Sequence, residues 1–354
     1  MSKPTYEEDL QQSKALHGST WEETEPPSST SDLRKLQYVD SWKEDQIGGS
    51  DDVKANSLSA HTVIANSFYD IFTDFFEYEW GPSFHYCRFY PGKPFRQAIA
   101  RYEHYLAAQM VIEPHFKILD AGCGVAGPAC EIARFTGAHI TGLNNNDYQI
   151  TRAKQHRANA GLEEQLHFVK GDFMSLPFES KSFDACYAIE ATFYAPSLED
   201  VYSQVCRVLK PGGVFVCHEF ALMDDYEPTN PEHLRIVRGI ELGPMKIVMG
   251  YLQALGHAGF TIEKHENLAA NDDKVPWYSP ANTARDYLTF LGRNRVGRFV
   301  SETLLSVLEK LYLIPNGSTE ACILLQLGID SIVEGAILGI FTPMCLFIAR
   351  KPFE

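Results

Sequence analysis

The feature that most constrains the fold is an alternation of short β-rich runs with helical segments between residues 116 and 221. The runs are nearly continuous in apolar residues, which is typical of strands buried on both faces. The alternation predicts an α/β fold, with a doubly wound parallel sheet covered by helices on both sides. The strand-like runs are FKILDAG, HITGLN, LHFVKGD, FDACYAIEA and VFVCHEFA, with MCLFIARK near the C-terminus.

A glycine-rich loop follows the first predicted strand. In FKILDAGCGVAGPACEIARF, Asp120 and three glycines lie between a strand and a helix. Small residues let a ligand approach the backbone, and the start of the helix offers N–H groups. Several nucleotide-binding folds share the spacing G-x-G-x-x-G, so the loop alone does not identify its ligand.

The later strands favour S-adenosylmethionine (SAM) over a dinucleotide. A dinucleotide site usually has an acid at the end of the second strand, which here ends in Asn144. D-x-G-x-G, GDFMSLPF and LKPGG, in that order, resemble the class I SAM-dependent methyltransferases. The resemblance implies a Rossmann-like, mostly parallel seven-stranded sheet with a helical N-terminal cap and a helical C-terminal insertion. The cofactor contacts expected are Asp120, Gly122, Gly124, Gly127, Asn144, Asn145, Gln149, Asp172 and Phe173.

Several of these residues also have a purely structural interpretation. The glycines could form a tight turn, and Asp120 could cap a helix. Asp172 and Asn144 could be turn residues, a position that both types favour.

Composition disfavours several partner classes. The net charge of −15 argues against nucleic acid, which basic clusters recognise. The eight cysteines include no C-x-x-C pair, so we expect neither a zinc site nor a disulfide framework, and no metal cofactor. A reducing compartment fits this pattern.

The chain is expected to divide into four regions. A polar, acidic N-terminal segment lacks the apolar residues needed to offset ordering entropy and is predicted to be disordered. A helical cap with the aromatic substrate region follows, with helices predicted over 57–76 and 95–111. A SAM-binding core and a C-terminal region complete the chain, and residues 230–335 are predicted to be mostly helical. The boundaries are 1–50, 51–112, 113–228 and 229–354.

No segment predicts a signal peptide or a membrane span. The N-terminus has no basic region followed by an apolar core. The apolar run 336–349 is interrupted by Thr342-Pro343 and is shorter than the ~20 residues that a span requires. We therefore predict that this run belongs to the protein core.

The stretch FFEYEWGPSFHYCRFYPGKPF, residues 75–95, combines many aromatic side chains with two glutamates. Methylation of a carbon–carbon double bond produces a carbocation, which aromatic faces stabilise by roughly 0.5–2 kcal/mol each. Water must be excluded from such a site. The stretch therefore predicts an aromatic lid across the SAM loop. The expected acceptor contacts are Tyr78, Trp80, Phe84, Tyr86, Phe89, Phe193 and Tyr194.

A closer resemblance covers about residues 55–352. EYEWGPSFHYCRFYPG, LDAGCGVAGP, GLNNNDYQI, YAIEATFYAP, NPEH, NDDKVPWYSP and FTPMCLFIARKP are similar to motifs of the fungal-type sterol 24-C-methyltransferase family. The resemblance implies SAM-dependent methylation of the side-chain C24 double bond of a sterol or related tetracyclic triterpenoid, followed by a hydride shift and loss of a proton. It also implies a homo-oligomer, located peripherally on the cytoplasmic side of the endoplasmic reticulum or on lipid droplets.

The sequence departs from the family pattern at several positions. Glu79 stands where the family usually has glycine, and Ala126 replaces a loop glycine. Phe193 and Tyr194 replace a cysteine and a histidine, and a few residues are missing after Gly243. These departures predict either a divergent sterol methyltransferase or a paralogue acting on a related triterpenoid.

Four residues are candidates for catalysis. Glu190 ends the fourth strand and could contact the cofactor end of the site or balance a cation. Glu77 and Glu79 could stabilise the cation or accept a proton, and His85 could relay the proton near neutral pH. The structural alternatives are a carboxylate satisfied by backbone N–H groups, solvated carboxylates and a buried histidine.

Two other functions remain open. The chain could be an O- or N-methyltransferase of another small molecule, which would need a polar acceptor pocket. It could also be a catalytically inactive SAM- or lipid-binding regulator.

Overall fold

The computed structural model describes most of the chain from Trp80 onward and a few residues before it. The predicted N-terminal disordered segment, most of the predicted helix 57–76 and residues 241–244, where the sequence is shorter than the family pattern, lie outside the described residues. Those residues of 57–76 that are described are all helical. The described residues are 69, 72–74, 76–77, 80–240, 245–270, 274–278, 295–313 and 318–353.

The chain forms one seven-stranded sheet with the order β3-β2-β1-β4-β5-β7-β6. Strands β1 to β5 run parallel, whereas β7 is antiparallel to both β5 and β6. The predicted mostly parallel seven-stranded α/β fold is therefore confirmed. The bounds are β1 Lys117–Ala121, β2 His139–Asn144, β3 Leu166–Lys170, β4 Phe183–Ile189, β5 Leu209–Leu222, β6 Thr261–Asn267 and β7 Phe341–Arg350.

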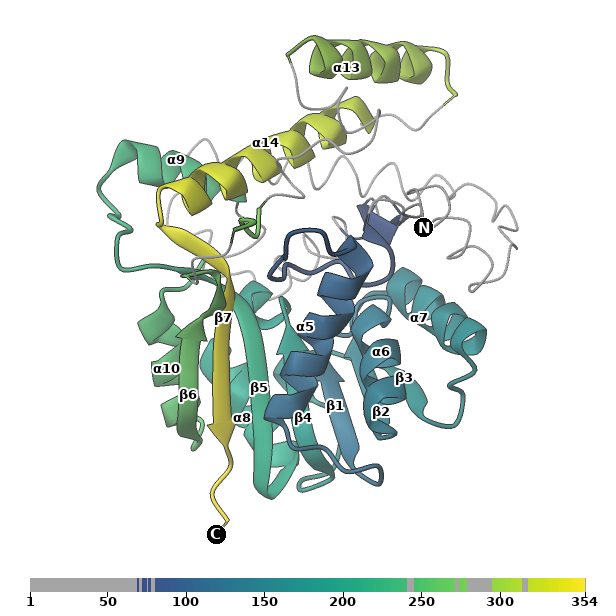
Figure 1. Cartoon of the computed structure of the whole chain (residues 1–354), viewed down its shortest axis with the longest axis vertical. Helices are drawn as coiled ribbons and strands as arrows, with labels where there is room; N and C mark the ends of the chain where they lie inside the picture. Colours follow the sequence, from purple (N-terminus) through teal and green to yellow (C-terminus); the bar gives the residue numbers. More distant parts are fainter. Residues whose placement is uncertain are drawn as a thin grey trace.

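Helices cover both faces of the sheet (Figure 1). One face carries α5 Phe95–Gln109, α6 Gly127–Thr136 and α7 Asp147–Ala160, and the other carries α8 Leu198–Val208 and α10 Val248–His257. Beyond the carboxyl ends of the parallel strands lie α9 Pro231–Ile240, α13 Arg295–Lys310 and α14 Ser318–Ile337. The short 3-10 turns are η1 Phe173–Ser175, η2 Thr192–Tyr194 and η3 Leu268–Ala270.

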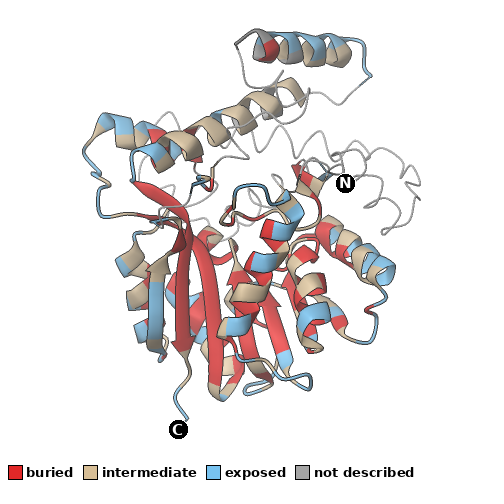
Figure 2. Cartoon of the chain, viewed as in Figure 1, coloured by how far each residue is buried: buried red, intermediate tan, exposed pale blue. Residues whose placement is uncertain are grey.

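The core follows the middle of the sheet (Figure 2). In β7 every residue except the last is buried, so the prediction that the apolar run 336–349 belongs to the core is correct for β7, whereas Ile337 and Leu338 before it are exposed. Pro343 lacks an N–H group, and a register shift between β5 and β7 at this point accommodates it. None of the described helices is long and apolar enough to cross a bilayer.

One strand lies where the sequence predicts mostly helix. β6, with the sequence TIEKHEN, forms an edge of the sheet and is largely exposed, so it has no continuous apolar run. Together with β7 it joins the C-terminal region to the same sheet as the glycine loop.

Candidate active site

A cleft opens at the carboxyl ends of β1, β2 and β4, on either side of β1, where the order of the sheet reverses. In open α/β sheets this is the usual place for a ligand. Its empty volume is about 860 Å³, including the part open to solvent. It is lined by Tyr69, Pro82, Phe84, His85, Asp120, Gly122, Cys123, Gly124, Val125, Pro128, Asn144, Asn145, Gln149, Phe173, Ile189, Glu190, Ala191 and Tyr194.

The glycine loop brings bare backbone to this cleft. Gly122 has φ +98, and a Cβ there would lie 2.4 Å from the Cβ of Ala191. Helix α6 follows a left-handed Ala126 and has no side-chain cap, so its first N–H groups are not satisfied by a capping side chain. Gly122 and Gly124, which were predicted to contact the cofactor, both line the cleft.

Gly127 has a different environment. It does not line this cleft, and a Cβ there would lie 2.1 Å from the carbonyl oxygen of Pro82. The aromatic segment therefore crosses directly over the start of α6. A glycine at position 127 is needed for this crossing, and the residue is not placed to contact a ligand in the cleft.

Asp120 places a buried carboxyl group on the cleft. It is 2% exposed, and its Oδ2 accepts a hydrogen bond of 2.9 Å from the hydroxyl of Tyr187. Burial raises the pKa of Asp120 to about 7, although the Tyr187 hydrogen bond opposes this shift. Because this pKa is near neutral, a charged or hydrogen-bonding ligand beside Asp120 would change its protonation state.

The end of β2 adds amide groups. Asn144 Nδ2 donates to Gln149 Oε1 at 2.8 Å and to the carbonyl of Gly124 at 3.3 Å. Gln149 Nε2 donates to the hydroxyl of Thr73 at 3.1 Å, which ties the N-terminal helical residues to the site. Asn145 lines the cleft beside them.

Asp172 and Phe173, the two predicted cofactor contacts after β3, lie in different environments. Phe173 lines the cleft, whereas Asp172 is exposed, lies outside the lining and caps η1 by accepting from the N–H of Met174 at 2.8 Å. This geometry corresponds to the turn alternative for Asp172.

Glu190 sits at the other end of the cleft. Its backbone has φ +50, an unfavourable conformation for a residue with a side chain. The carboxylate accepts a 2.7 Å hydrogen bond from the N–H of Tyr86. Burial raises the pKa of Glu190 well above its usual value, with the nearby Glu219 adding to the effect.

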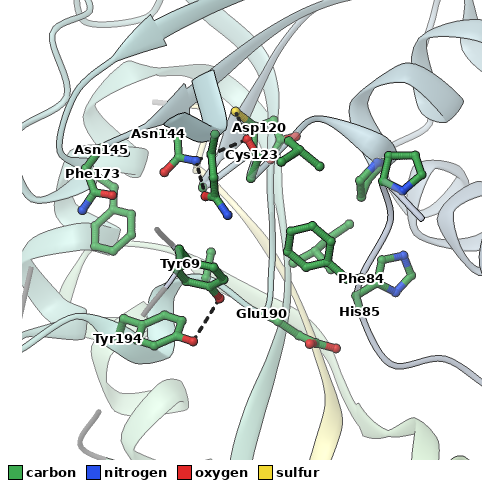
Figure 3. Close-up of a pocket in the computed structure, with 18 residues that line it drawn as sticks. Tyr69, Phe84, His85, Asp120, Cys123, Asn144, Asn145, Phe173, Glu190 and Tyr194 are labelled. Atoms are coloured by element: carbon green, nitrogen blue, oxygen red, sulfur yellow. Dashed lines mark hydrogen bonds between the residues drawn. The ribbon is translucent and has the colours of Figure 1, made fainter. Parts of the chain in front are cut away.

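Aromatic groups face one another across this end. Figure 3 shows the hydroxyls of Tyr69 and Tyr194 meeting on one side of the cleft and Phe84 on the other. The two hydroxyl oxygens are 3.0 Å apart and hydrogen-bonded. Burial raises the pKa of Tyr69 to about 12, so its phenol is neutral.

Most of the other predicted aromatic residues do not line the cleft. Phe193 is 2% exposed and stacks on Phe220 at 4.6 Å, and Tyr86 packs edge-on against Trp277 at 5.1 Å. Phe89 stacks on Phe95, and Trp80 stacks on Phe76. Tyr78 and Glu79 lie outside the described residues.

Glu77 is not in the cleft lining. Its carboxylate pairs with Arg152 and His156 of α7, with 2.7 Å between Oε2 and Arg152 Nε. Burial acts to raise the pKa of Glu77, but the hydrogen bonds from His156 and Arg152 outweigh it and lower the pKa. Glu77 thus fastens the N-terminal helical residues to α7.

His85 lines the cleft with both ring nitrogens engaged. Nε2 lies 3.2 Å from Oε1 of the buried Glu103, and Nδ1 lies 3.0 Å from the carbonyl oxygen of Tyr86. His85 is thus anchored from behind, toward α5.

Glu219, which was not predicted, organises the turn after Glu190. Its Oε1 accepts from the N–H and hydroxyl of Thr192, each at 2.7 Å, and from the N–H of Ala191 at 3.3 Å. Its Oε2 accepts from the N–H of Phe193 at 3.3 Å. A lone acid within the apolar run VFVCHEFA was the available signal, because buried carboxylates need such partners.

These residues fit SAM. The uncapped helix start, the amides of Asn144 and Asn145 and the carboxyl of Asp120 provide polar partners, and Val125, Ile189 and Phe173 provide an apolar wall. Across the described ranges no cluster of three or more His, Cys, Asp or Glu side chains could hold a metal ion.

The fold and this cleft define a class I methyltransferase. The model "Methyltransferase domain" matches residues 119–217. The solved structure of the cyclopropane synthase MmaA2 from Mycobacterium tuberculosis has the same fold, with a TM-score of 0.65 at 14% identity, covering 84% of this chain and 100% of that one.

Comparison with curated sequences narrows the class to a family. The model "Sterol methyltransferase C-terminal" matches residues 288–353. The sterol 24-C-methyltransferase of Candida albicans is 43% identical over 368 residues, covering 100% of this chain and 98% of the relative. That of Saccharomyces cerevisiae is 44% identical, covering 89% and 85%. The chain belongs to the sterol 24-C-methyltransferase family and is a SAM-dependent methyltransferase.

Proposed function

We propose that this enzyme methylates the side-chain C24 double bond of a sterol or related tetracyclic triterpenoid, with a hydride shift and loss of a proton, in ergosterol-type sterol or triterpenoid biosynthesis. The observation that carries the proposal is Glu190, a largely buried carboxyl group at the aromatic end of a cleft that begins at the glycine loop. The family membership of the chain supports the same reaction.

The proposed cofactor half of the cleft comprises the ends of β1 and β2. When bound there, SAM supplies an electrophilic methyl group. Asp120, Asn144 and Asn145 would hold its polar groups, Phe173 would pack against its apolar surface, and Gly122 and Gly124 would let it reach the backbone. Gln149 holds Asn144 in position.

The proposed acceptor half comprises Phe84, Tyr69 and Tyr194. Their π-faces suit a transient cation, and their packing against the buried aromatic wall behind them excludes water. Glu190 is the proposed acceptor of the proton, because its carboxyl group lines the cleft at this end. Tyr194, where the family usually has histidine, and the buried Phe193 beside it are proposed to shape acceptor choice.

A product assay tests this proposal. Purified protein is incubated with SAM and with zymosterol, lanosterol or an acid-bearing lanostane, and products are analysed by mass spectrometry. We expect a methylated product from at least one of these alkenes, and much less from Glu190→Gln, which should still bind SAM. Binding of SAM without product from any Δ24 acceptor would exclude alkene methylation and favour the regulator, and methylation of only a hydrophilic acceptor would favour O- or N-transfer.

We also propose peripheral association with the lipid surface of the endoplasmic reticulum or of lipid droplets. The acceptor is insoluble in water, and α13 with the turn after it has an exposed apolar stripe, Val300, Leu304, Val307 and Leu311, at helical spacing. This stripe lies on the side of the sheet where the cleft opens (Figure 1).

Vesicle flotation tests the stripe. Val300→Ser combined with Leu304→Ser should reduce binding to sterol-containing vesicles several-fold, whereas Phe135→Ser, at an exposed residue of α6, should not. If the double variant instead dissociates a homo-oligomer while vesicle binding is unchanged, the stripe is a subunit interface and the lipid proposal is wrong.

A further inference from the structure

A buried acid of β5 holds the turn that follows Glu190. Glu219 is 0% exposed, and in the part of the chain that the structure describes no lysine, arginine or histidine pairs with it. A buried charge without a cation is costly, and an apolar side chain would fill the same place in the strand without that cost. Packing therefore does not explain an acid at this position, and the reason must lie in its hydrogen-bond partners.

The groups that face this carboxyl group are hydrogen-bond donors of the turn. Oε1 accepts from the N–H and the hydroxyl of Thr192 at 2.7 Å each and from the N–H of Ala191 at 3.3 Å, and Oε2 accepts from the N–H of Phe193 at 3.3 Å. The N–H of Glu190 donates to the carbonyl of His218, the preceding residue of β5, at 2.7 Å. Four successive backbone N–H groups of the turn are therefore bound to two neighbouring residues of β5.

The same turn reaches both halves of the proposed site. Glu190 and Tyr194 line the cleft at its acceptor end. Ala191 lies against the glycine loop, because its Cβ would be 2.4 Å from a Cβ at Gly122. Glu190 itself has φ +50, and such strained conformations persist only where the surrounding contacts over-determine them. The hydrogen bonds to Glu219 are contacts of this kind, so they fix Glu190 relative to the cofactor loop.

The two acids also interact electrostatically. Burial raises the pKa of Glu190 well above its usual value, and the nearby Glu219 adds to the effect. Burial raises the pKa of Glu219 to about 7, although the hydrogen bonds from the turn oppose this shift. The charge beside the turn therefore depends on these two acids, because burial keeps the other ionisable groups around Glu219 neutral. These groups are Cys217 and His218 of β5, Tyr202 of α8, Tyr251 of α10 and Cys345 of β7, and burial lowers the pKa of the histidine and raises the pKa of the others.

We propose that Glu219 is a positioning residue that decides which hydrogen Glu190 removes from the cationic acceptor. This inference rests on the proposed function. A C–H bond beside a cationic carbon is so acidic that the strength of the base matters little, and the base must only lie within reach of the hydrogen. The C–H bond breaks, its electron pair becomes the new C=C bond, and the proton forms an O–H bond on Glu190. Glu190 reacts as the carboxylate, the form that a neighbouring cation favours.

Substitution of Glu219 tests this role. Glu219→Gln keeps the size of the side chain but removes its charge and replaces one acceptor oxygen by an amide NH2 group, so part of the turn loses its acceptor. We expect SAM consumption to stay within about 3-fold of the wild type, while the ratio of the main alkene to other alkenes and to the alcohol formed by water falls about 10-fold, the scale of one lost hydrogen bond to a charged group. Mass spectrometry with chromatography measures this product ratio, and an unchanged ratio would contradict the proposal.

A pH titration gives a readout that a purely structural role would not change. In the wild type, the alkene formed per SAM consumed should fall as the pH is lowered, because protonated Glu190 cannot accept the proton. In Glu219→Gln this fall should occur at lower pH, because the variant removes the neighbouring charge that raises the pKa of Glu190. A fall at the same pH in both proteins would mean that Glu219 does not act on Glu190, and the proposal would be wrong.

Thr192 supplies a second pair of variants if Glu219→Gln does not fold. Thr192→Val removes the hydroxyl that donates to Glu219 at 2.7 Å with little change in volume, whereas Thr192→Ser keeps a hydroxyl. The product ratio of Thr192→Val should fall, and that of Thr192→Ser should stay close to the wild type. Equal ratios for these two variants would contradict the proposal.

Cys345→Ala is the matched control. Cys345 of β7 is buried opposite Glu219 in the register of the sheet, but no hydrogen bond among the described residues joins it to the turn. The product ratio of this variant should be that of the wild type. A change as large as that of Glu219→Gln would mean that packing in the sheet is responsible, and the positioning role would be wrong.

The outcomes also separate this inference from the proposed function. If the wild type makes no methylated product, the proposed function fails. If the wild type makes it and both Glu219→Gln and Thr192→Val keep its product ratio, only the positioning role fails.

Discussion

Individual positions in the loop after β1 decide whether a ligand can reach the backbone. Gly122→Ala should abolish SAM binding, because its Cβ would lie 2.4 Å from the Cβ of Ala191. Gly161→Ala is the matched control: Gly161 also has positive φ, but no atom lies within 4 Å of a Cβ there. Gly161→Ala should lose roughly 1 kcal/mol from backbone strain, and Gly122→Ala should lose more because of the clash with Ala191. Calorimetry should detect lost SAM binding only for Gly122→Ala. Equal binding by the two variants would contradict the assignment of the loop.

The carboxyl of Asp120 should make ligand-free stability depend on pH. Its pKa rises from 3.8 to about 7 on folding, so the unfolded chain binds fewer protons between these values. This contribution therefore destabilises the fold as pH rises through that window. Asp120→Asn removes this pH-dependent contribution. The melting temperature of the variant, minus that of the wild type, should therefore increase from pH 4 to pH 7. A difference that stays constant with pH would show that Asp120 is not protonated on folding.

Among the site residues, the sequence predicts what depends on local motif and fails where distant contacts decide. Gly122 and Asp120 follow from a strand-loop-helix pattern, and the structure places both in the cleft. Gly127 has the same spacing but faces Pro82, a contact with a distant segment that spacing cannot reveal. Glu219 lies within an apolar run, and its hydrogen-bond partners come from the turn that contains η2.

At the scale of elements, the ion pair of Glu77 joins the N-terminal helical residues to α7. Glu77→Gln should destabilise the protein by about 1–3 kcal/mol, since Arg152 and His156 lose a nearly buried partner. The folded pKa is lowered, so this stabilisation is present above about pH 4.5 and is lost as pH falls through the lower, folded pKa. Thermal unfolding across this range and amide exchange from Trp80 to Tyr86 would measure both effects.

The outcome also distinguishes the two interpretations of Glu77. As a structural residue it should leave the ratio of methylated products unchanged, and Arg152→Met should produce no further loss in the Glu77→Gln background. An altered product ratio at full folding would instead support the catalytic role predicted from sequence.

Elements were predictable to the extent that their own residues carry a pattern. β1, β2, β4, β5 and β7 are apolar and mostly buried, the edge strand β3 is only partly buried, and helix α5 begins at the predicted residue. β6 is polar and exposed, and it forms a strand because it pairs with β7. The sequence TIEKHEN alone does not predict this pairing. The antiparallel direction of β7 is likewise set by the return of the chain from α14.

For the whole molecule, the sheet depends on its last strand. β7 lies between β5 and β6, and nine of its ten residues are buried. A chain ending before Phe341 should therefore not fold, although it retains the whole glycine loop, because β5 would lose one of its two partners and β6 would lose the strand it pairs with. Circular dichroism and a thermal melt would check this. A cooperative transition in the truncated chain would show that the parallel half is independently stable.

The crossing of Pro82 over Gly127 restricts how this enzyme can evolve. A methyl group at position 127 would displace the aromatic segment, although the residue lies in a motif associated with the cofactor. Substitutions at position 127 should therefore lower the turnover of the acceptor and leave the affinity for SAM unchanged. Second-site revertants should map to residues 82 and 83, where Ser83→Gly would remove the hydroxyl that lies 2.4 Å from the added carbon and give the backbone beside Pro82 more freedom to move. Two sequence motifs that look independent would then be inherited as one.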